Sequence, residues 1–231
     1  MKAIILAGGL GTRLKPFTEI IPKPLLPIGE KAVLEIQIER LKACGFNEIY
    51  LATNYKSEYI ESFFGDGSRY GVSLIISKEK TSLGTAGPLS LLREKLDEAF
   101  IVMNGDILTL LNFKDLLEYA LMKKTCLTVA IKKEIFPFHF GNIQYEGDYI
   151  VSIEEKPNFI VNIVAGIYAM TPEIFQYIPY NQPYGMDQLM KQLLQKNVPI
   201  AKYELRDYWL DIGRVEDYEK AQDFYTKHLK E

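Results

Sequence analysis

The feature that most constrains the fold is the regular alternation of apolar runs with segments of helical period. Apolar runs predict buried strands at residues 2–7, 47–53, 72–77 and 99–104. Segments with helical spacing of apolar side chains predict helices at residues 31–45, 57–64, 88–96 and 113–122. Strands joined by helices in this order lie parallel, with right-handed crossovers and helices on both faces. The sequence therefore predicts an α/β fold: a doubly wound, mostly parallel, Rossmann-like sheet flanked by helices.

The second half of the chain changes to a β-rich pattern. It predicts strands at residues 125–133 and 163–170, a hairpin at 141–157, and a strand pair or one bent strand at 201–211. The hairpin is expected to turn at Gly147 and Asp148, and helices are expected at residues 185–197 and 216–229. No repeat or linker divides the chain, so we expect a single domain over residues 1–231 with a small β-rich elaboration.

Charge and composition exclude several classes of partner. The net charge is −3 and the lysines and arginines are scattered, so neither nucleic acid nor a membrane surface is an expected partner. No apolar stretch approaches the roughly 20 residues that span a bilayer. Cys44 and Cys126 lie outside any metal-binding spacing and are interpreted as small core residues in a reducing compartment. We therefore expect a cytoplasmic protein.

A glycine-rich loop follows the first strand and predicts a phosphate site. Gly8, Gly9 and Gly11 let backbone N–H groups approach phosphate oxygens, and Arg13 adds a forked, permanently charged donor. Leu14 stands where a P-loop has its lysine and where a dinucleotide fingerprint has its third glycine. The loop thus matches neither common template, and a simple turn with a surface arginine is the alternative.

Three further residues extend this candidate site. Lys23 lies between two prolines that fix its backbone, which suits an ammonium aimed at a phosphate, although a solvated loop lysine has the same pattern. Asp106 follows the fourth strand and Asp211 lies in a strand near the C-terminus; two such carboxylates can hold Mg²⁺. Ligands of parallel sheets bind beyond the carboxyl ends of the strands, so the glycine loop and Asp106 are expected at one rim. Each aspartate taken singly is also compatible with a helix cap.

The motifs taken together resemble one enzyme family. GGLGTRL, PKPLLPIG, LGTAGPL, NGD, EEKP, AGIY and WLDIG occur in this order along nearly the whole chain. This series resembles the sugar-1-phosphate nucleotidylyltransferases (nucleotide-sugar pyrophosphorylases), and LGTAGPL and PKPLLPIG are most similar to the mannose-1-phosphate and heptose-1-phosphate guanylyltransferases. The resemblance implies that residues 1–125 mainly bind nucleotide, and that residues 126–231 mainly bind sugar and add the C-terminal helix.

The resemblance also implies a reaction. A sugar-1-phosphate oxygen attacks the α-phosphorus of a nucleoside triphosphate, and pyrophosphate leaves in a Mg²⁺-dependent single displacement. Such chemistry depends on positioning and charge neutralisation, and no general base is required.

Carried over by motif, Arg13 and Lys23 are the expected catalytic residues, and Asp106 and Asp211 are the expected metal ligands. The expected nucleotide-binding residues are Leu6, Ala7, Gly8, Gly9, Gly11, Thr12, Arg13, Glu79, Gly84 and Thr85. The expected sugar-phosphate residues are Asn104, Gly141, Glu155, Lys156, Asn162 and Gly166.

The base and the sugar are predicted from single positions. Glu79 stands five residues before Gly84, where the family has a base-reading residue. A carboxylate accepts both the N1–H and N2–H₂ donors of guanine, whereas uracil and thymine would present carbonyl oxygens to it. GTP is therefore the favoured nucleotide, and UTP or dTTP is the alternative substrate. The alternative interpretation of Glu79 is a solvated charge at the end of a strand, with no role in binding. The family usually has Asn at the position that Val164 occupies here. Asn162, two residues earlier, lies on the same face of the strand and could take its place, so the identity of the sugar is left open.

Two other classes of protein are alternatives to the enzyme. A non-catalytic, nucleotide-sugar-binding regulatory homologue would be expected to lose Arg13, Lys23, Asp106 or Asp211, and all four are present. A glycosyltransferase with a DxD metal site is disfavoured, because NGD offers one aspartate. An apolar stripe on the last helix leaves a homodimer open.

Overall fold

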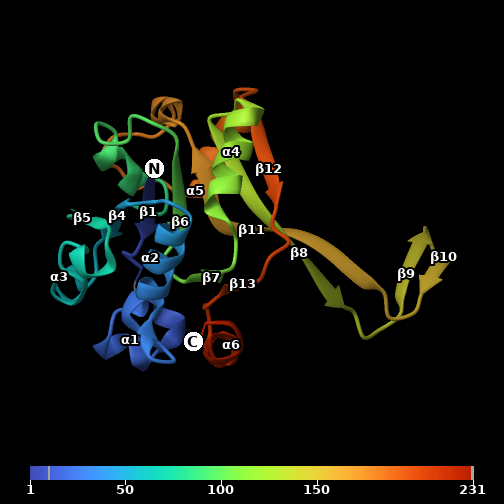
Figure 1. The fold of residues 1–231 in the computed structure, drawn as a ribbon. Coiled ribbons are helices and arrows are strands. Elements are labelled where there is room, and N and C mark those ends of the chain that lie inside the picture. The colour runs from blue at the N-terminus through green and yellow to red at the C-terminus, as the bar shows by residue number, and fades with distance from the viewer. Residues whose placement is uncertain (10, 230–231) are drawn as a thin grey trace.

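The computed structural model describes residues 1–9 and 11–229 of the 231-residue chain. Its centre is a seven-stranded sheet in the order β12-β8-β11-β6-β1-β4-β5 (Figure 1). The strands are β1 (Lys2–Leu6), β4 (Glu48–Thr53), β5 (Ser73–Lys78), β6 (Phe100–Asn104), β8 (Leu127–Pro137), β11 (Asn158–Met170) and β12 (Ile200–Glu204). β11 runs antiparallel to both of its neighbours, whereas the other pairs in this sheet are parallel. The predicted mostly parallel sheet is confirmed.

Each face of the sheet carries its own hydrophobic core, which confirms the doubly wound architecture. In β1, Ala3 and Ile5 face one core and Ile4 faces the other, so the strand reads as a continuous apolar run. Helices α2 (Val33–Ala43), α3 (Ser57–Phe64) and α4 (Phe113–Lys123) cover the first face. The second face is covered by α5 (Met186–Gln195) and by the 3₁₀ helices η4 (Gly87–Leu92) and η5 (Pro172–Gln176).

A third, smaller core lies at the C-terminal helix α6 (Val215–His228) and packs the ends of the chain together. Phe224 of α6 packs in one cluster with Leu14 and Ile212. Leu14 belongs to the 3₁₀ helix η1 (Thr12–Leu14), directly after the glycine loop. The remaining short elements of this region are α1 (Phe17–Ile20), η2 (Lys23–Leu25), β2 (Pro27–Ile28), β3 (Lys31–Ala32), β7 (Ile107–Thr109) and β13 (Trp209–Asp211). The core thereby connects the glycine loop to the segment that carries Asp211.

The β-rich elaboration is a long extension formed by residues 132–164, called the arm below; the rest of the described chain is called the body. The outer parts of β8 and β11 run together away from the sheet and end in a hairpin of β9 (Asn142–Glu146) and β10 (Tyr149–Glu154) (Figure 1). Gly147 and Asp148 form its turn, as predicted. None of the helices in the described residues is long and apolar enough to cross a bilayer.

Two predictions about elements need correction. The α-helix expected at residues 88–96 is the 3₁₀ helix Gly87–Leu92. It is fixed by the segment before α5: Gly87 N–H donates to Tyr184 O at 3.0 Å, and the Ser90 side-chain oxygen accepts a hydrogen bond from Asn181 N–H at 2.9 Å. The strands expected at 125–133 and 163–170 both extend further along the arm, to Pro137 and back to Asn158, because they pair with each other there. The segment 201–211 is two strands in separate sheets, which settles the alternative left open.

Candidate functional site

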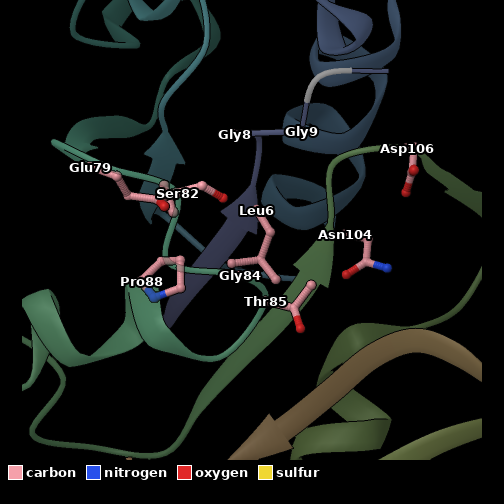
Figure 2. Close-up of a pocket in the computed structure, with 11 residues that line it drawn as sticks. Leu6, Gly8, Gly9, Glu79, Ser82, Gly84, Thr85, Pro88, Asn104 and Asp106 are labelled. Carbon is pink, nitrogen blue, oxygen red and sulfur yellow. The ribbon is translucent and has the colours of Figure 1, made fainter. Parts of the chain in front are cut away.

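A cavity of about 290 Å³ opens beyond the carboxyl ends of β1, β4 and β6 (Figure 2). β1 lies between β4 and β6, and at this topological switch point the connections leave in opposite directions, which is where ligands bind such sheets. The cavity is lined by Leu6, Gly8, Gly9, Ala52, Glu79, Ser82, Gly84, Thr85, Pro88, Asn104 and Asp106. Most of the residues predicted to contact the nucleotide therefore lie at one place. The other predicted nucleotide-binding residues follow the same strand but are outside this lining: Ala7, Gly11, Thr12 and Arg13.

The three glycines of the loop differ in their surroundings and in the reason a side chain is absent there. A Cβ on Gly8 would lie 3.0 Å from Glu79 Oε1, so glycine is what lets that carboxylate approach the loop. A Cβ on Gly9 would meet no described atom within 4 Å, which leaves its backbone open to the cavity. Gly11 has a φ of +63°, and its carbonyl accepts a hydrogen bond from Thr18 Oγ1 at 2.8 Å.

Glu79 is an ionisable group buried at the wall of the cavity. Its side chain is 7% exposed, and Oε2 accepts a hydrogen bond from Leu83 N–H at 2.8 Å. Burial raises the pKa of Glu79 above its ordinary value, and the hydrogen bond from Leu83 opposes that rise. Figure 2 shows Glu79, Ser82 and Pro88 on one side of Leu6, with Asn104 and Asp106 on the other. Glu79 and Asp106 thus lie at opposite ends of the cavity.

The loop of residues 83–87 is fixed by the segment that precedes α5. Ala86 N–H and Gly87 N–H both donate to Tyr184 O, at 2.9 and 3.0 Å. Gly84 has a φ of +76° and packs directly on the same carbonyl. Thr85 Oγ1 accepts a hydrogen bond from Met186 N–H at 2.8 Å. The Thr85 hydroxyl therefore also holds the first turn of α5 while its residue lines the cavity.

At the other end, strand pairing brings Asp106 and Asp211 together. β13 pairs antiparallel with β7, and Ile212 N–H donates to Asp106 O at 2.9 Å. Lys23 Nζ donates to Asp106 Oδ2 in a partly buried ion pair. The Oδ1 atoms of Asp106 and Asp211 are buried and have no hydrogen-bond partner among the described residues. Two buried acceptor atoms thus stay free beside the cavity.

Arg13 completes this cluster of charges. A Cβ on Gly213 would lie 3.4 Å from Arg13 Nη1 and 3.5 Å from Asp211 Oδ1, so both side chains border this glycine. Burial, followed by the negative charge of Asp106, raises the pKa of Asp211, while Lys23 and Arg13 act in the opposite direction. The structure therefore gathers two cations and two carboxylates that lie far apart in the sequence.

The predicted sugar-phosphate residues fall into two groups. Asn104 and Gly166 lie in the body, where Gly166, with a φ of +68°, packs directly against the Asn104 side chain. Gly141, Glu155, Lys156 and Asn162 are exposed on the arm, and none of them lines the cavity. Within the arm, a Cβ on Gly141 would lie 3.1 Å from Glu155 Oε2, so those two residues are adjacent.

Sequence reasoning missed one positioning residue and several wall residues. Gln37 is buried in α2, and its Nε2 donates to Asn104 O at 3.1 Å and to Ile107 O at 2.8 Å. It therefore fixes the turn that carries Asp106. A signal was available, because Gln37 stands on the apolar stripe between Val33 and Leu41. Of the missed wall residues, Pro88 lies within the LGTAGPL motif, which was a signal, whereas Ala52 and Ser82 have no distinguishing pattern.

The chain matches the nucleotidyl transferase family over residues 2–228. It belongs to that family. A relative from Danio rerio, mannose-1-phosphate guanylyltransferase catalytic subunit beta, is 34% identical over 239 residues, covering 100% of this chain and 66% of the relative. A UTP–glucose-1-phosphate uridylyltransferase from Synechocystis is 34% identical over 241 residues, covering 96% of this chain and 62% of the relative. The chain thus spans about two thirds of the length of these relatives.

Two solved nucleotidyl transferase structures resemble the whole chain. A protein from Bacillus anthracis, described as a glucose-1-phosphate thymidylyltransferase, has a TM-score of 0.79 at 27% identity and covers 97% of this chain and 94% of its own. HddC from Yersinia pseudotuberculosis, solved in complex with GMP-PN, has a TM-score of 0.77 at 28% identity and covers 97% of this chain and 99% of its own. The fold and the family are therefore shared, while the names of the relatives differ in nucleotide and in sugar.

Proposed function

We propose that this nucleotidyl transferase moves a nucleoside monophosphate from GTP to a sugar 1-phosphate, forming an NDP-sugar and pyrophosphate. The observation that carries the proposal is the convergence of Arg13, Lys23, Asp106 and Asp211 beside a cavity at the switch point of the sheet. The two cationic side chains can neutralise phosphates, and the two carboxylates could hold a divalent cation that would neutralise further negative charge. The two cysteines are both free, which is consistent with the reducing, cytoplasmic location that we propose for the reaction.

Mg²⁺ is the proposed cofactor, and the residues present fit it. The Oδ1 atoms of Asp106 and Asp211 are buried without a hydrogen-bond partner among the described residues, which is costly unless something else satisfies them. Magnesium prefers oxygen ligands, is commonly held by one or two carboxylates, and completes its shell with water and substrate phosphates. When bound, it would neutralise charge on the phosphates.

The chain's own residues position the reactants. The backbone of Gly8 and Gly9 faces the cavity, where N–H groups can hold the triphosphate. An oxygen of the sugar phosphate forms a bond to the α-phosphorus as the α–β bridging bond breaks, and pyrophosphate leaves with that electron pair. Arg13 and Lys23 stabilise the charge of the departing group. No proton needs to move, because the attacking phosphate oxygen is already anionic.

GTP is the proposed nucleotide because of Glu79. Its carboxylate lines the cavity at the end opposite Asp106, so the base and the phosphates would lie at separate ends (Figure 2). Glu79 can accept the two donors on the Watson–Crick edge of guanine. The mannose-1-phosphate guanylyltransferase of Danio rerio and the GMP-PN complex of HddC support this choice. The uridylyltransferase and the thymidylyltransferase support the alternative, UTP or dTTP.

The sugar is proposed to be of the mannose or heptose type. The observation against mannose itself is Val164, which is 45% exposed on β11 and gives no hydrogen bond to a sugar hydroxyl. Asn162 lies on the same strand face, two residues earlier, and is exposed. A less polar contact at one hydroxyl is therefore expected.

The test is pyrophosphate release with Mg²⁺ from each of the four common nucleoside triphosphates, combined with mannose-, heptose-, glucose- and glucosamine-1-phosphate. We expect the fastest release with GTP and mannose- or heptose-1-phosphate. Release only with UTP or dTTP would overturn the role of Glu79 while leaving the reaction intact. The absence of pyrophosphate release in every combination would overturn catalysis and favour a non-catalytic protein that binds nucleotide-sugars.

A further inference from the structure

The arm, residues 132–164, leaves the central sheet as a two-stranded ribbon. β12 pairs with β8 only as far as Ile131, and β6 pairs with β11 only from Ile167 onward. Between those points and the hairpin, β8 and β11 pair with each other. An isolated ribbon of two strands is marginally stable in water. The arm therefore needs a surface to pack against.

The side chains of the arm indicate that it is normally covered. Neighbours in sequence point to opposite faces of a strand, and the pair Ile135 and Phe136 is exposed by 62% and 53%. The pair Ile160 with Val161, in the regular part of the β8–β11 ladder, is exposed in the same way, so both faces of the arm are apolar. The arm holds more than half of the large apolar side chains that the described residues expose. A concentration of this kind marks an interaction surface.

The arm also carries the residues that the nucleotide cavity lacks. Glu155 and Lys156, the proposed contacts to the sugar and its phosphate, lie beyond β10 near the base of the hairpin and are exposed. The cavity of about 290 Å³ is slightly smaller than typical ligand sites, which measure about 300–1,000 Å³. It holds no arm residue, so the sugar side of the site has no wall from the arm of the same chain.

The arm is held in a direction that keeps it from its own cavity. Its ladder is continuous from Ile131 opposite Val164 to Pro137 opposite Asn158. The base is fixed where Lys132 Nζ donates to Asp207 O at 2.8 Å and Lys133 pairs with Glu204 at 3.1 Å. Figure 1 shows the arm extending away from the sheet. For the arm to fold back onto the cavity of its own chain, the pairing between β8 and β11 would have to break.

We propose that two copies of this chain exchange arms, so that the arm of each copy covers the sugar side of the other copy's cavity. Two-fold symmetry completes both sites at once, because the same surfaces meet twice and the interface closes. Each apolar arm is then buried against the second copy, and each Glu155 and Lys156 serves the site of the other copy. The contribution to sugar binding rests on the proposed function.

The first test measures mass and needs no substrate. The wild-type chain is expected to behave as a dimer in sedimentation equilibrium, and the Ile160→Lys variant as a monomer that keeps the wild-type circular dichroism spectrum. Tyr180→Lys is the matched control, because Tyr180 is a large apolar side chain of similar exposure, 61% against 65%, located in the body. A monomeric wild type, or a dimer unaffected by Ile160→Lys, would overturn arm exchange.

The second test asks whether the two halves of one site come from different chains. Asp106→Asn and Lys156→Ala are co-expressed with different tags, and the mixed dimer is isolated through both. It is assayed at a sugar 1-phosphate concentration near the wild-type KM, where the raised KM of Lys156→Ala leaves a site with that lesion little turnover. If arms are exchanged, one site of the mixed dimer carries both lesions and the other carries none, so about half of the wild-type turnover returns. If each chain completes its own site, both sites carry a lesion and turnover stays at the level of the single variants.

The two tests separate this inference from the proposed function. A wild-type chain that forms the dimer but releases no pyrophosphate would overturn the reaction and leave arm exchange standing. A monomeric wild type with full turnover would do the reverse.

Discussion

The two halves of the site are built in opposite ways. The nucleotide half consists of loops that follow buried parallel strands, and its backbone is held by neighbours on several sides: Gly105 N–H donates to Leu6 O at 2.9 Å, and Glu79 N–H donates to Thr53 O at 2.8 Å. The arm that carries Glu155 and Lys156 is a ribbon with exposed faces. The first half is preorganised by the fold, whereas the second depends on what the arm meets.

This difference assigns separate tasks to the two regions. A rigid nucleotide half can hold a phosphate and its counter-charges in a fixed geometry, which is where transition-state stabilisation is gained. A sugar half on an arm can vary without disturbing that geometry. Damage to the first half should therefore lower turnover, and damage to the arm should weaken sugar binding.

The largest effect is expected from Asp211→Asn. The substitution keeps the shape of the side chain but removes one of the two carboxylates that we assign to the metal. Removing a single group that stabilises charge in a transition state costs about 10²–10³ in kcat, and we expect a loss of that order. The measurement is pyrophosphate release at saturating substrates, with circular dichroism to check the fold. Glu118→Gln on the exposed surface of α4 is the control, and near-normal turnover of Asp211→Asn would remove this residue from the metal site.

Lys156→Ala is expected to weaken binding of the sugar 1-phosphate while leaving binding of the nucleotide nearly unchanged. Loss of a hydrogen bond to a charged group costs about 1.5–3 kcal/mol, so the KM for the sugar 1-phosphate should rise about 10- to 100-fold. The KM for the nucleoside triphosphate should stay within a factor of about two, since none of the arm residues lines the cavity.

The control for that comparison is Lys202→Ala, an exposed lysine of β12 outside the arm. Equal increases in both KM values for Lys156→Ala would contradict the separation of the two halves. So would an unchanged KM for the sugar 1-phosphate.

Local pattern was sufficient to predict the body of the molecule. Strands buried on both faces, such as β1, read as continuous apolar runs, and the rule that ligands bind beyond strand ends placed the glycine loop and Asp106 at one rim. The pairing that brings Asp211 to Asp106 was not derivable from either segment. It depends on contact between β7 and β13, which lie about a hundred residues apart in the chain.

The arm shows where the sequence was insufficient. Alternation and the Gly147–Asp148 turn predicted a hairpin correctly, but the direction of that hairpin depends on how far β8 and β11 stay paired after leaving the sheet. Pairing length is a property of two distant segments, and each of them alone reads as an ordinary strand. The assignment of Glu155 and Lys156 to the same cavity as Glu79 therefore could not be tested from the sequence.

Glu79→Gln tests the base end of the nucleotide half. The Gln oxygen can still accept from Leu83 N–H, but its amide group would present donors to the donors of guanine. A good bidentate contact to a base discriminates by about 1–3 kcal/mol, so the ratio of kcat/KM for GTP over UTP should fall by about 5- to 150-fold. Competition between the two nucleotides in one reaction measures this ratio. An unchanged ratio would show that Glu79 does not read the base.

The same variant has a predicted effect on stability. Burial raises the pKa of Glu79, so the ionised carboxylate costs stability in the folded state at neutral pH. Glu79→Gln should therefore melt at a higher temperature than the wild type at pH 7. The advantage should shrink as the pH falls through the raised folded pKa and vanish below the unfolded value of about 4.3. Thermal melts of both proteins from pH 4 to 8 measure it, and a constant difference across that range would contradict the assignment.

The smallest effect is expected from Gln37→Leu, which acts on the nucleotide half without touching a ligand. The substitution keeps the apolar stripe of α2 but leaves the carbonyls of Asn104 and Ile107 without their donor. Two lost hydrogen bonds should lower the free energy of unfolding by about 1–3 kcal/mol. The turn carrying Asp106 should also become less well fixed, so kcat is expected to fall a few-fold while both KM values change little. A loss of stability with kcat unchanged would show that Gln37 supports the core alone, and that the position of Asp106 is set by its pairing with Lys23 and by the β7–β13 ladder.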